Sequence, residues 1–314
     1  MTNPILTIGM PVHNGEAYLA AALDSVLAQT MGDIEVVISD NASTDATRAI
    51  GESYARRDPR VRYTRTDANI GAGPNFNRVF GLCRTPFFKW MAHDDLLDPA
   101  WAERCLKVLA EDAGVVLAHT AITLVDETGR PLPVRQDGKV IDRAGRRHHD
   151  REPPHLAEGA WAPDRFAEVL RRMNWCTAVF GMMRSDALRR THLHGSYYEA
   201  DRVLLAEMAL LGRFCQLDAP LFIKRCHGGV SVLKTFREQA RMIDPAVHPW
   251  PRGIRLRLGY LKTLGVGDLG VVERAACAVT VARVTLRNRL TYRLRTGMPR
   301  RRAGDPVPQR ERPV

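Results

Sequence analysis

Residues 34–45 read Ile-Glu-Val-Val-Ile-Ser-Asp-Asn-Ala-Ser-Thr-Asp, an apolar run that ends abruptly in carboxylates and hydroxyls. The run is short and rich in β-branched residues, which is typical of a strand buried on both faces of a parallel sheet. Residues 45–57 follow at once with the apolar spacing of a helix. A strand, a polar turn and a helix in this order predict the beginning of a βαβ unit.

The same succession extends to both sides of this stretch. The expected elements are a strand at 5–10, a helix at 16–29, a strand at 61–65, a helix at 73–83, a strand at 86–91 and a helix at 99–111. The last of these helices has a proline in its first turn, where proline is well tolerated. Repeated alternation of this kind predicts an α/β fold with a mostly parallel sheet and helices on both of its faces.

The pattern is less regular in the second half of the chain. Residues 130–163 are rich in Arg, Pro, Asp and His, and a connection this long predicts a lid or a flexible insertion. Around it, we expect one or two strands at 115–125, helices at 164–173 and 199–211, an apolar segment at 176–183, and strands at 214–217 and 221–226. Ser196 and Glu199 have the spacing of a capping box for the second helix.

The net charge of +11 comes from the end of the chain. Residues 252–314 contain 15 Lys and Arg and four acidic residues, so residues 1–251 are neutral overall. We expect a helical basic extension at 251–297 and a disordered, Arg/Pro-rich tail at 298–314. A helical wheel of residues 274–295 scatters the arginines around the circumference and shows no clean membrane-surface face, although basic segments attract anionic lipid.

Composition excludes several classes of protein. No stretch reaches the roughly 18 uncharged apolar residues of a membrane span, and the first residues lack the pattern of a signal peptide, so a cytoplasmic protein is expected. The six cysteines lie far apart without zinc spacing and are predicted to be reduced thiols. The basic extension has only Tyr260 and Tyr292 as aromatic residues, so no nucleic-acid partner is expected.

Polar segments follow each of the first four predicted strands. They are residues 11–16, 40–45, 69–77 and 93–95. Because ligands of open parallel sheets bind beyond the carboxyl ends of the strands, these segments are the candidate binding loops. Each one is a weak signal by itself, since Ser43-Thr-Asp45, for example, also suits a helix cap.

Asp94 and Asp95 form the sharpest local signal. Two adjacent carboxylates repel each other, a cost that a divalent cation or a bound polyol would offset. Hard oxygen ligands suit Mg²⁺ or Mn²⁺, which would neutralise a departing diphosphate. In the alternative interpretation, the pair caps the helix at 99–111.

Together these segments resemble the family 2 glycosyltransferases, which have a Rossmann-like fold of the GT-A type. Pro11-x-x-Asn14 with Leu19, Asp40-x-x-Ser43-x-Asp45, Asn69-x-Gly71 and the pair of aspartates match the family's motifs in order and spacing. There are departures: His13 replaces a tyrosine, Asn75-Phe76 stands where Ala-Arg is common, and His93 replaces the first aspartate of a triplet. The match covers roughly residues 5–125 and weakens toward 235.

The resemblance implies an inverting transfer of sugar from a nucleoside diphosphate sugar, most simply a UDP-sugar, to a hydroxyl acceptor. By the same resemblance, Asp40 contacts the nucleobase, Asp94 the ribose, and Asp95 a Mn²⁺ or Mg²⁺ ion on the diphosphate. Pro11, Asn14 and Gly71 belong to the donor site, and His227 in Arg225-x-His227-x-x-x-Ser231 lies near the diphosphate. Asp201 aligns with the family's general base.

Structural roles compete with two of these assignments. Asp201 also suits a first helical turn, where a negative charge is favourable, and a lone histidine such as His227 often serves packing alone. The resemblance divides the chain into a donor half at 1–125 and an acceptor half at 126–250.

Two other functions remain open at this stage. A sugar nucleotidyltransferase would need a Gly-rich opening loop, which residues 11–16 lack. A non-catalytic module, tethered to membrane or nucleic acid by the basic extension, would bind no nucleotide.

Overall fold

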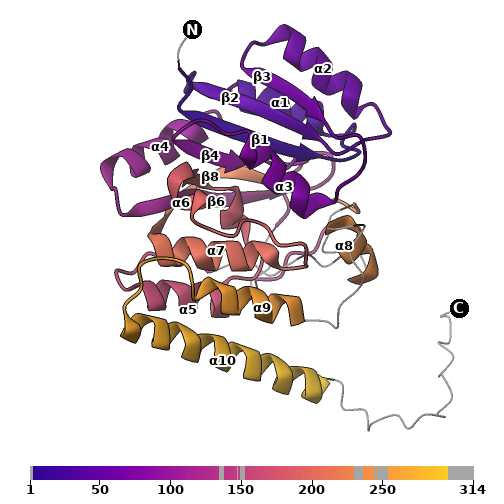
Figure 1. The fold of residues 1–314 in the computed structure, drawn as a ribbon. Coiled ribbons are helices and arrows are strands. Elements are labelled where there is room, and N and C mark those ends of the chain that lie inside the picture. Colours follow the sequence, from indigo (N-terminus) through magenta and orange to yellow (C-terminus); the bar gives the residue numbers. More distant parts are fainter. Residues whose placement is uncertain are drawn as a thin grey trace, which may run out of the picture.

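The computed structural model describes residues 3–133, 138–146, 148, 153–229, 236–243, 245 and 254–295. One mixed sheet forms its centre (Figure 1). The strands are β1 (Leu6–Val12), β2 (Ile34–Asp40), β3 (Val61–Arg65), β4 (Phe87–Trp90), β5 (Leu96–Leu97), β6 (Val115–Val125), β7 (Met182–Arg184) and β8 (Arg213–Arg225). Their order across the sheet is β3-β2-β1-β4-β7-β6-β8-β5.

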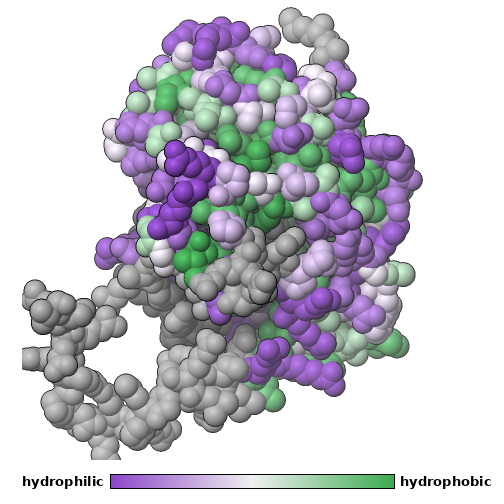
Figure 2. Space-filling model, turned by 180° about the vertical axis from the view of Figure 1, so that it is seen from behind, coloured by the Kyte–Doolittle hydropathy of each residue, from purple (hydrophilic) through white to green (hydrophobic). Residues whose placement is uncertain are grey.

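The sheet is parallel over its first half and mixed over its second. β1 pairs in parallel with β2 and β4, β2 with β3, and β6 with β8, whereas β7 and β5 run antiparallel to their neighbours. The carboxyl ends of β1, β2 and β3 therefore lie along one edge, on the right in Figure 1. In the view from behind, where that edge lies on the left, hydrophilic residues gather along it (Figure 2).

Helices cover both faces of the sheet. They are α1 (Leu19–Leu27), α2 (Thr47–Arg57), α3 (Ala72–Gly81), α4 (Trp101–Glu111), α5 (Ala162–Arg172), α6 (Ser185–Arg189), α7 (Ala200–Leu211), α8 (Phe236–Ile243), α9 (Ile254–Thr263) and α10 (Val271–Arg295), with a 3₁₀ turn, η1, at Thr177–Phe180. Val36 and Ile38 pack in the core with α1 and α4, whereas Val37 packs on the opposite face with α3, α5 and α7. Burial on both faces explains why this strand shows no polar alternation.

The C-terminal helices form a stack at one end of the molecule. α7 packs against α5 and α9, and α10 packs against α5 and α9 as the outermost helix (Figure 1). Within the described residues, no helix combines the length and the apolar character that crossing a membrane requires. All six cysteines are free thiols, as their spacing predicts.

The α/β class, the mostly parallel sheet and the C-terminal helices agree with the sequence analysis, and two local predictions need correction. Residues 115–125 form a single strand, which is one of the two expected possibilities. Residues 213–225 form one continuous β8 in place of two strands, because β8 stays paired with β6 across two register shifts. The capping box is wrong: Glu199 adopts a left-handed conformation at the N-cap, with φ 67°, and no side chain caps the helix.

Other predictions fall partly outside the described residues. Ser231 and the tail at 298–314 lie beyond them, as do residues 134–137, 147 and 149–152 within the expected insertion at 130–163. In the described part of that insertion, the buried carboxylate of Asp142 contacts Nε2 of His148 at 3.0 Å and Nε of Arg146 at 2.6 Å.

Candidate active site

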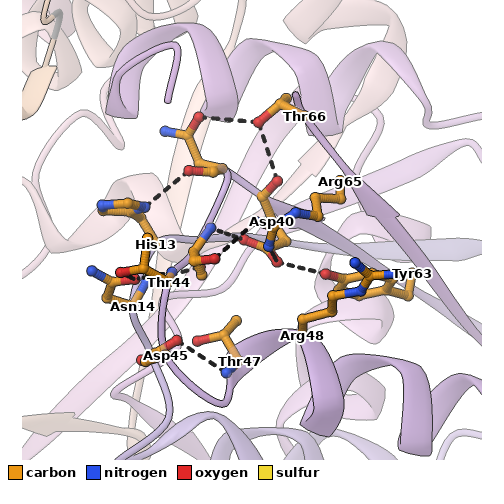
Figure 3. Close-up of polar contacts among 12 residues, drawn as sticks. His13, Asn14, Asp40, Thr44, Asp45, Thr47, Arg48, Tyr63, Arg65 and Thr66 are labelled. Carbon is orange, nitrogen blue, oxygen red and sulfur yellow. Dashed lines mark hydrogen bonds and ion pairs between the residues drawn. The ribbon is translucent and has the colours of Figure 1, made fainter. Parts of the chain in front are cut away.

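The loops that follow β1 and β2 are joined by hydrogen bonds (Figure 3). Asn14 adopts a left-handed backbone with φ 51°, which asparagine tolerates well. Its Oδ1 accepts the backbone N–H of Thr44 at 2.8 Å, and its own N–H donates to Oγ of Ser43 at 2.9 Å. Glu16 N–H donates to Asp45 at 3.0 Å. The first two polar segments therefore form one rigid unit at the edge of the sheet.

Pro11 lies inside β1, where its register partner is Ser39 of β2. β4 pairs with β1 only as far as Gly9. The missing N–H of Pro11 therefore falls where the pairing with β4 has already ended.

Asp40 is fully buried, and protein groups already engage both of its carboxylate oxygens. Oδ1 accepts the N–H of Ser43 at 2.8 Å, while Oδ2 accepts the hydroxyl of Tyr63 at 2.5 Å and Nη1 of Arg65 at 2.6 Å. Burial disfavours its charge, but these hydrogen bonds outweigh burial and hold the pKa of Asp40 below its usual value. Burial and the bond to Asp40 raise the pKa of Tyr63 to about 12.

The third polar segment joins the other two through Asn41 and Asn69. Asn41 Nδ2 donates to Asn69 Oδ1 at 2.9 Å, and Asn69 Oδ1 also accepts the N–H of Gly71 at 2.8 Å. Gly71 is the N-cap of α3 with φ 89° and ψ 162°, a conformation open essentially to glycine alone. His13 contacts the carbonyl of Asn41 at 2.9 Å and the amide of Asn69 at 3.2 Å.

The fourth segment meets the end of β8. Asp94 Oδ2 lies 2.9 Å from Nε2 of His227, and Arg225 Nε donates to the Asp94 carbonyl at 3.0 Å. The Gly229 N–H donates to Nδ1 of His227 at 3.1 Å, so Nε2 carries the proton that Asp94 accepts. Burial opposes the charge on Asp94, but the bond from His227 and the nearby charges of His93 and Lys224 hold its pKa below the usual range.

Asp95 points into the protein. Its carboxylate is fully buried, Oδ1 accepts the N–H of Arg225 at 2.9 Å, and Oδ2 lies 3.5 Å from the ammonium of Lys224. Burial and the charge of Asp94 raise the pKa of Asp95 in spite of Lys224. The two adjacent aspartates thus occupy different environments, one partly open and the other closed.

Tyr18 covers the histidine from the side of β1. Its ring centroid lies 5.0 Å from that of His227, and the guanidinium carbon of Arg225 lies 4.7 Å from the centre of the Tyr18 ring. The loop after β1 and the end of β8 therefore enclose Asp94 together. Sequence reasoning missed Tyr18, although it stands just before α1 in the opening motif.

α3, in the first half of the chain, is tied to the segment that leads to α7 in the second half. Asn77 forms two hydrogen bonds of 2.9 Å with the backbone of His194, in the segment that leads to α7. Asp201 is half-buried in the first turn of α7, where its Oδ1 accepts the Arg202 N–H at 2.9 Å. Trp175 and Phe180 are also half-buried, and the ammonium of Lys224 lies 5.6 Å and 5.4 Å from their rings.

Asp94 and His227 are chemically suited to hold a divalent cation. They bring a carboxylate oxygen and an imidazole nitrogen to within 2.9 Å of each other at the open edge of the sheet. Over the ranges that the structure describes, no cluster of three or more metal-ligating side chains occurs. Mg²⁺ and Mn²⁺ sites that act on phosphates often use only one or two side chains, because substrate oxygens and water complete the coordination. Asp95 offers no open oxygen for such a site.

Comparison with known proteins identifies the class. The family described as Glycosyl transferase family 2 matches residues 7–185. The chondroitin synthase of Escherichia coli is 32% identical over 126 residues, which cover 40% of this chain and 18% of that protein. The putative glycosyltransferase EpsH of Bacillus subtilis is 30% identical over 132 residues, which cover 42% and 38%. The chain thus spans well under half the length of these relatives.

Solved structures share the fold. S. aureus TarS 1–349 in complex with UDP-GlcNAc has a TM-score of 0.62 at 18% identity, with coverage of 94% of this chain and 75% of that one. The mannosyltransferase PcManGT from Pyrobaculum calidifontis, in complex with GDP-Man and Mn²⁺, has a TM-score of 0.53 at 14% identity, with coverage of 95% and 80%.

The fold is that of a GT-A glycosyltransferase, with a polar edge beyond the carboxyl ends of its parallel strands. Since the family match covers more than half of the chain, the chain belongs to glycosyltransferase family 2.

Proposed function

We propose that this glycosyltransferase transfers a sugar from a nucleoside diphosphate sugar, most simply a UDP-sugar, to a hydroxyl acceptor with inversion at the anomeric carbon. The contact of 2.9 Å between Asp94 and His227, at the polar edge of the sheet, is the observation that carries the proposal. The UDP-GlcNAc and GDP-Man complexes of proteins with this fold support a nucleotide-sugar donor.

Asp94 and His227 would hold Mn²⁺ or Mg²⁺ against the diphosphate, and Asp95 would fix the end of β8 from below. This replaces the assignment of the metal to Asp95 that the motif implies, because the Asp95 carboxylate is buried and already paired. A bound cation would neutralise the negative charge that develops on the departing diphosphate. A cation held at Nε2 of His227 would require the imidazole proton to move to Nδ1, which now accepts the Gly229 N–H.

The remaining donor residues are proposed to position the nucleotide. Asp40 would shape the nucleobase subsite through Arg65 and Ser43, because both of its own oxygens are engaged. Pro11, Asn14 and Gly71 would fix the three loops around the base and the ribose, and Asp94, on its open side, would lie near the ribose as well as the diphosphate.

Asp201 is proposed as the general base. It would accept the proton of the acceptor hydroxyl while that oxygen attacks the anomeric carbon and the nucleoside diphosphate leaves. Single displacement needs only one such carboxylate. Its place in the first turn of α7, whose preceding segment is tied to α3 by Asn77, puts it in the half of the molecule where an acceptor would enter.

Calorimetric titration of UDP, GDP and dTDP, with and without Mn²⁺, tests the donor half. We expect one diphosphate to bind in a metal-dependent manner. Asp94→Asn and His227→Gln should each weaken the metal-dependent part at least tenfold. Asp95→Asn, in protein shown to be folded, should retain it.

Two results would overturn these assignments. If folded Asp95→Asn loses metal-dependent binding and Asp94→Asn keeps it, Asp95 would be the metal ligand, as the motif implies. Failure of the folded protein to bind any nucleotide would favour a non-catalytic module. For Asp201→Asn we expect unchanged donor affinity and loss of transfer, and undiminished turnover would exclude it as the base.

A further inference from the structure

α10 has two apolar faces, and only one of them is covered by protein. Cys277, Val281 and Val284 are buried and belong to the core cluster that contains α5 and α7. On the opposite side, Val272, Val279 and Leu286 are 75%, 48% and 58% exposed. These three residues are seven apart, so they form one line along the helix.

Alanines widen this exposed line, and α9 carries exposed leucines of its own. Ala275 and Ala282, each between two members of the line, are exposed as well. On α9, which packs beside α10, Leu258 and Leu261 are also exposed. Of the nine large hydrophobic side chains that are exposed among the described residues, six lie in residues 258–286; they are Leu258, Leu261, Val271, Val272, Val279 and Leu286. We call these six residues the outer apolar face.

The charge around the outer apolar face is strongly positive. Residues 254–295 contain nine Lys and Arg and only two acidic residues, Asp268 and Glu273. Both acids are engaged within the protein, because Asp268 pairs with Arg190 at 3.0 Å and Glu273 accepts the Gly270 N–H at 2.9 Å. Arg283 and Arg287 are exposed, one turn apart, beside the line of Val279 and Leu286. An apolar strip with arginines at its margin matches an anionic lipid surface.

The same charges argue against a second copy of the chain on this face. An α10 pair would bring two strongly basic helices together, with like charges at close range. The helical wheel drawn from sequence shows no clean face, because the arginines are scattered around it and an inner apolar face, which the structure buries, lies opposite the outer one. Once the inner face is assigned to the core, an amphipathic surface remains.

We propose that the outer apolar face of α9 and α10 lies on an anionic membrane surface, with its valines and leucines at the acyl boundary and its arginines among the headgroups. The helices rest on the surface and do not cross it, in keeping with the absence of a membrane-spanning helix among the described residues. This inference does not depend on the proposed donor or mechanism.

Vesicle co-sedimentation of the full chain tests the proposal without any nucleotide. Wild-type protein should bind vesicles of phosphatidylglycerol and phosphatidylcholine, and bind pure phosphatidylcholine much less. The Val279→Gln/Leu286→Gln variant should lose about tenfold or more in partitioning. Arg283→Gln/Arg287→Gln should lose roughly fivefold per arginine and show weaker salt dependence.

Matched controls separate the face from general effects. Met242→Gln replaces an exposed hydrophobic residue on α8, and Arg48→Gln replaces an exposed arginine on α2, so both should bind vesicles like wild type. Circular dichroism checks the folding of each variant. We expect it to be unchanged, because the substituted side chains are exposed. Equal binding by the Val279/Leu286 variant and wild type would overturn the proposal. So would dimerisation through this face, seen by light scattering, in protein that binds no anionic vesicles.

Discussion

The buried carboxylate of Asp95 accepts the backbone N–H of Arg225 at 2.9 Å, a bond between residues 130 positions apart. Lys224 supplies the neighbouring positive charge at 3.5 Å. Through these two contacts Asp95 holds the end of β8 in place. The neighbouring residue, Asp94, makes the contact with His227.

Asp95→Ala is therefore expected to destabilise the protein by about 3–5 kcal/mol, because it leaves Lys224 without its buried partner and the Arg225 N–H without an acceptor. Urea denaturation measures the change. Asp95→Asn keeps an acceptor oxygen and should cost less. The double variant Asp95→Ala/Lys224→Met should recover part of the loss, and no recovery would show that the unpaired ammonium is not its cause.

Arg65→Met should make the protein more sensitive to acid. The pKa of Asp40 is lowered in the folded state, so its contribution to stability is fully present above its unfolded value of 3.8 and disappears as the pH falls through the lower folded value. Without Arg65, the folded pKa rises and this contribution shrinks. The midpoint of acid unfolding, followed by circular dichroism, should move to higher pH. Arg48→Met, which removes an exposed pair with Glu52, should leave the midpoint unchanged.

Gly71→Ala is expected to cost about 2 kcal/mol, because a Cβ disfavours the backbone conformation that begins α3 with φ 89°. Gly81, at the end of the same helix, has nothing within 4 Å of an added Cβ. Gly81→Ala should therefore be neutral or stabilising by up to about 1 kcal/mol. Thermal or urea unfolding of the two variants compares them directly, and equal effects would contradict this account.

Lys89 is expected to make the stability of the protein depend on pH. It is fully buried, donates to the carbonyl of Phe180 and lies 4.2 Å from the centre of the Trp101 ring. Burial lowers its pKa to about 7 in the folded protein, from 10.5. Between these values the unfolded chain binds a proton that the folded chain lacks, so Lys89 makes stability rise with pH across this range.

Lys89→Met should remove that rise and increase the free energy of unfolding at pH 7 by about 1–3 kcal/mol, because an apolar side chain of similar length avoids the burial of a charge. Denaturation between pH 6 and 10 provides the measurement. Lys107→Met, at an exposed position on α4, is the matched control and should keep the wild-type slope. An unchanged slope in Lys89→Met would show that Lys89 titrates normally.

The parallel half of the fold is well predicted from sequence because its signals are local. Ile34 to Asp40 carries the apolar run, the burial and the terminal carboxylate of β2 within seven residues, and the following helix lies next to it. The polar loops after the strands follow from the same pattern, since parallel strands end at one edge.

The second half is harder because its signals are distant in sequence. Nothing near Asp94 shows that His227 will lie beside it, or that Lys224 will separate the environments of two adjacent aspartates. Residues 218–220 also separate two apolar runs in the sequence, while pairing with β6 makes them one strand. On α10, burial alone distinguishes the inner apolar face from the outer one.

The position of β8 also has a consequence during protein synthesis. Asp94 precedes His227 by 133 residues, so the ribosome completes the whole of the family-matched region before it adds the histidine. At roughly 5–20 residues per second, this interval lasts on the order of ten seconds. A nascent chain therefore spends that time with its first strands made and the sheet unfinished, and the contact of Asp94 with His227 can form only after β8 has emerged.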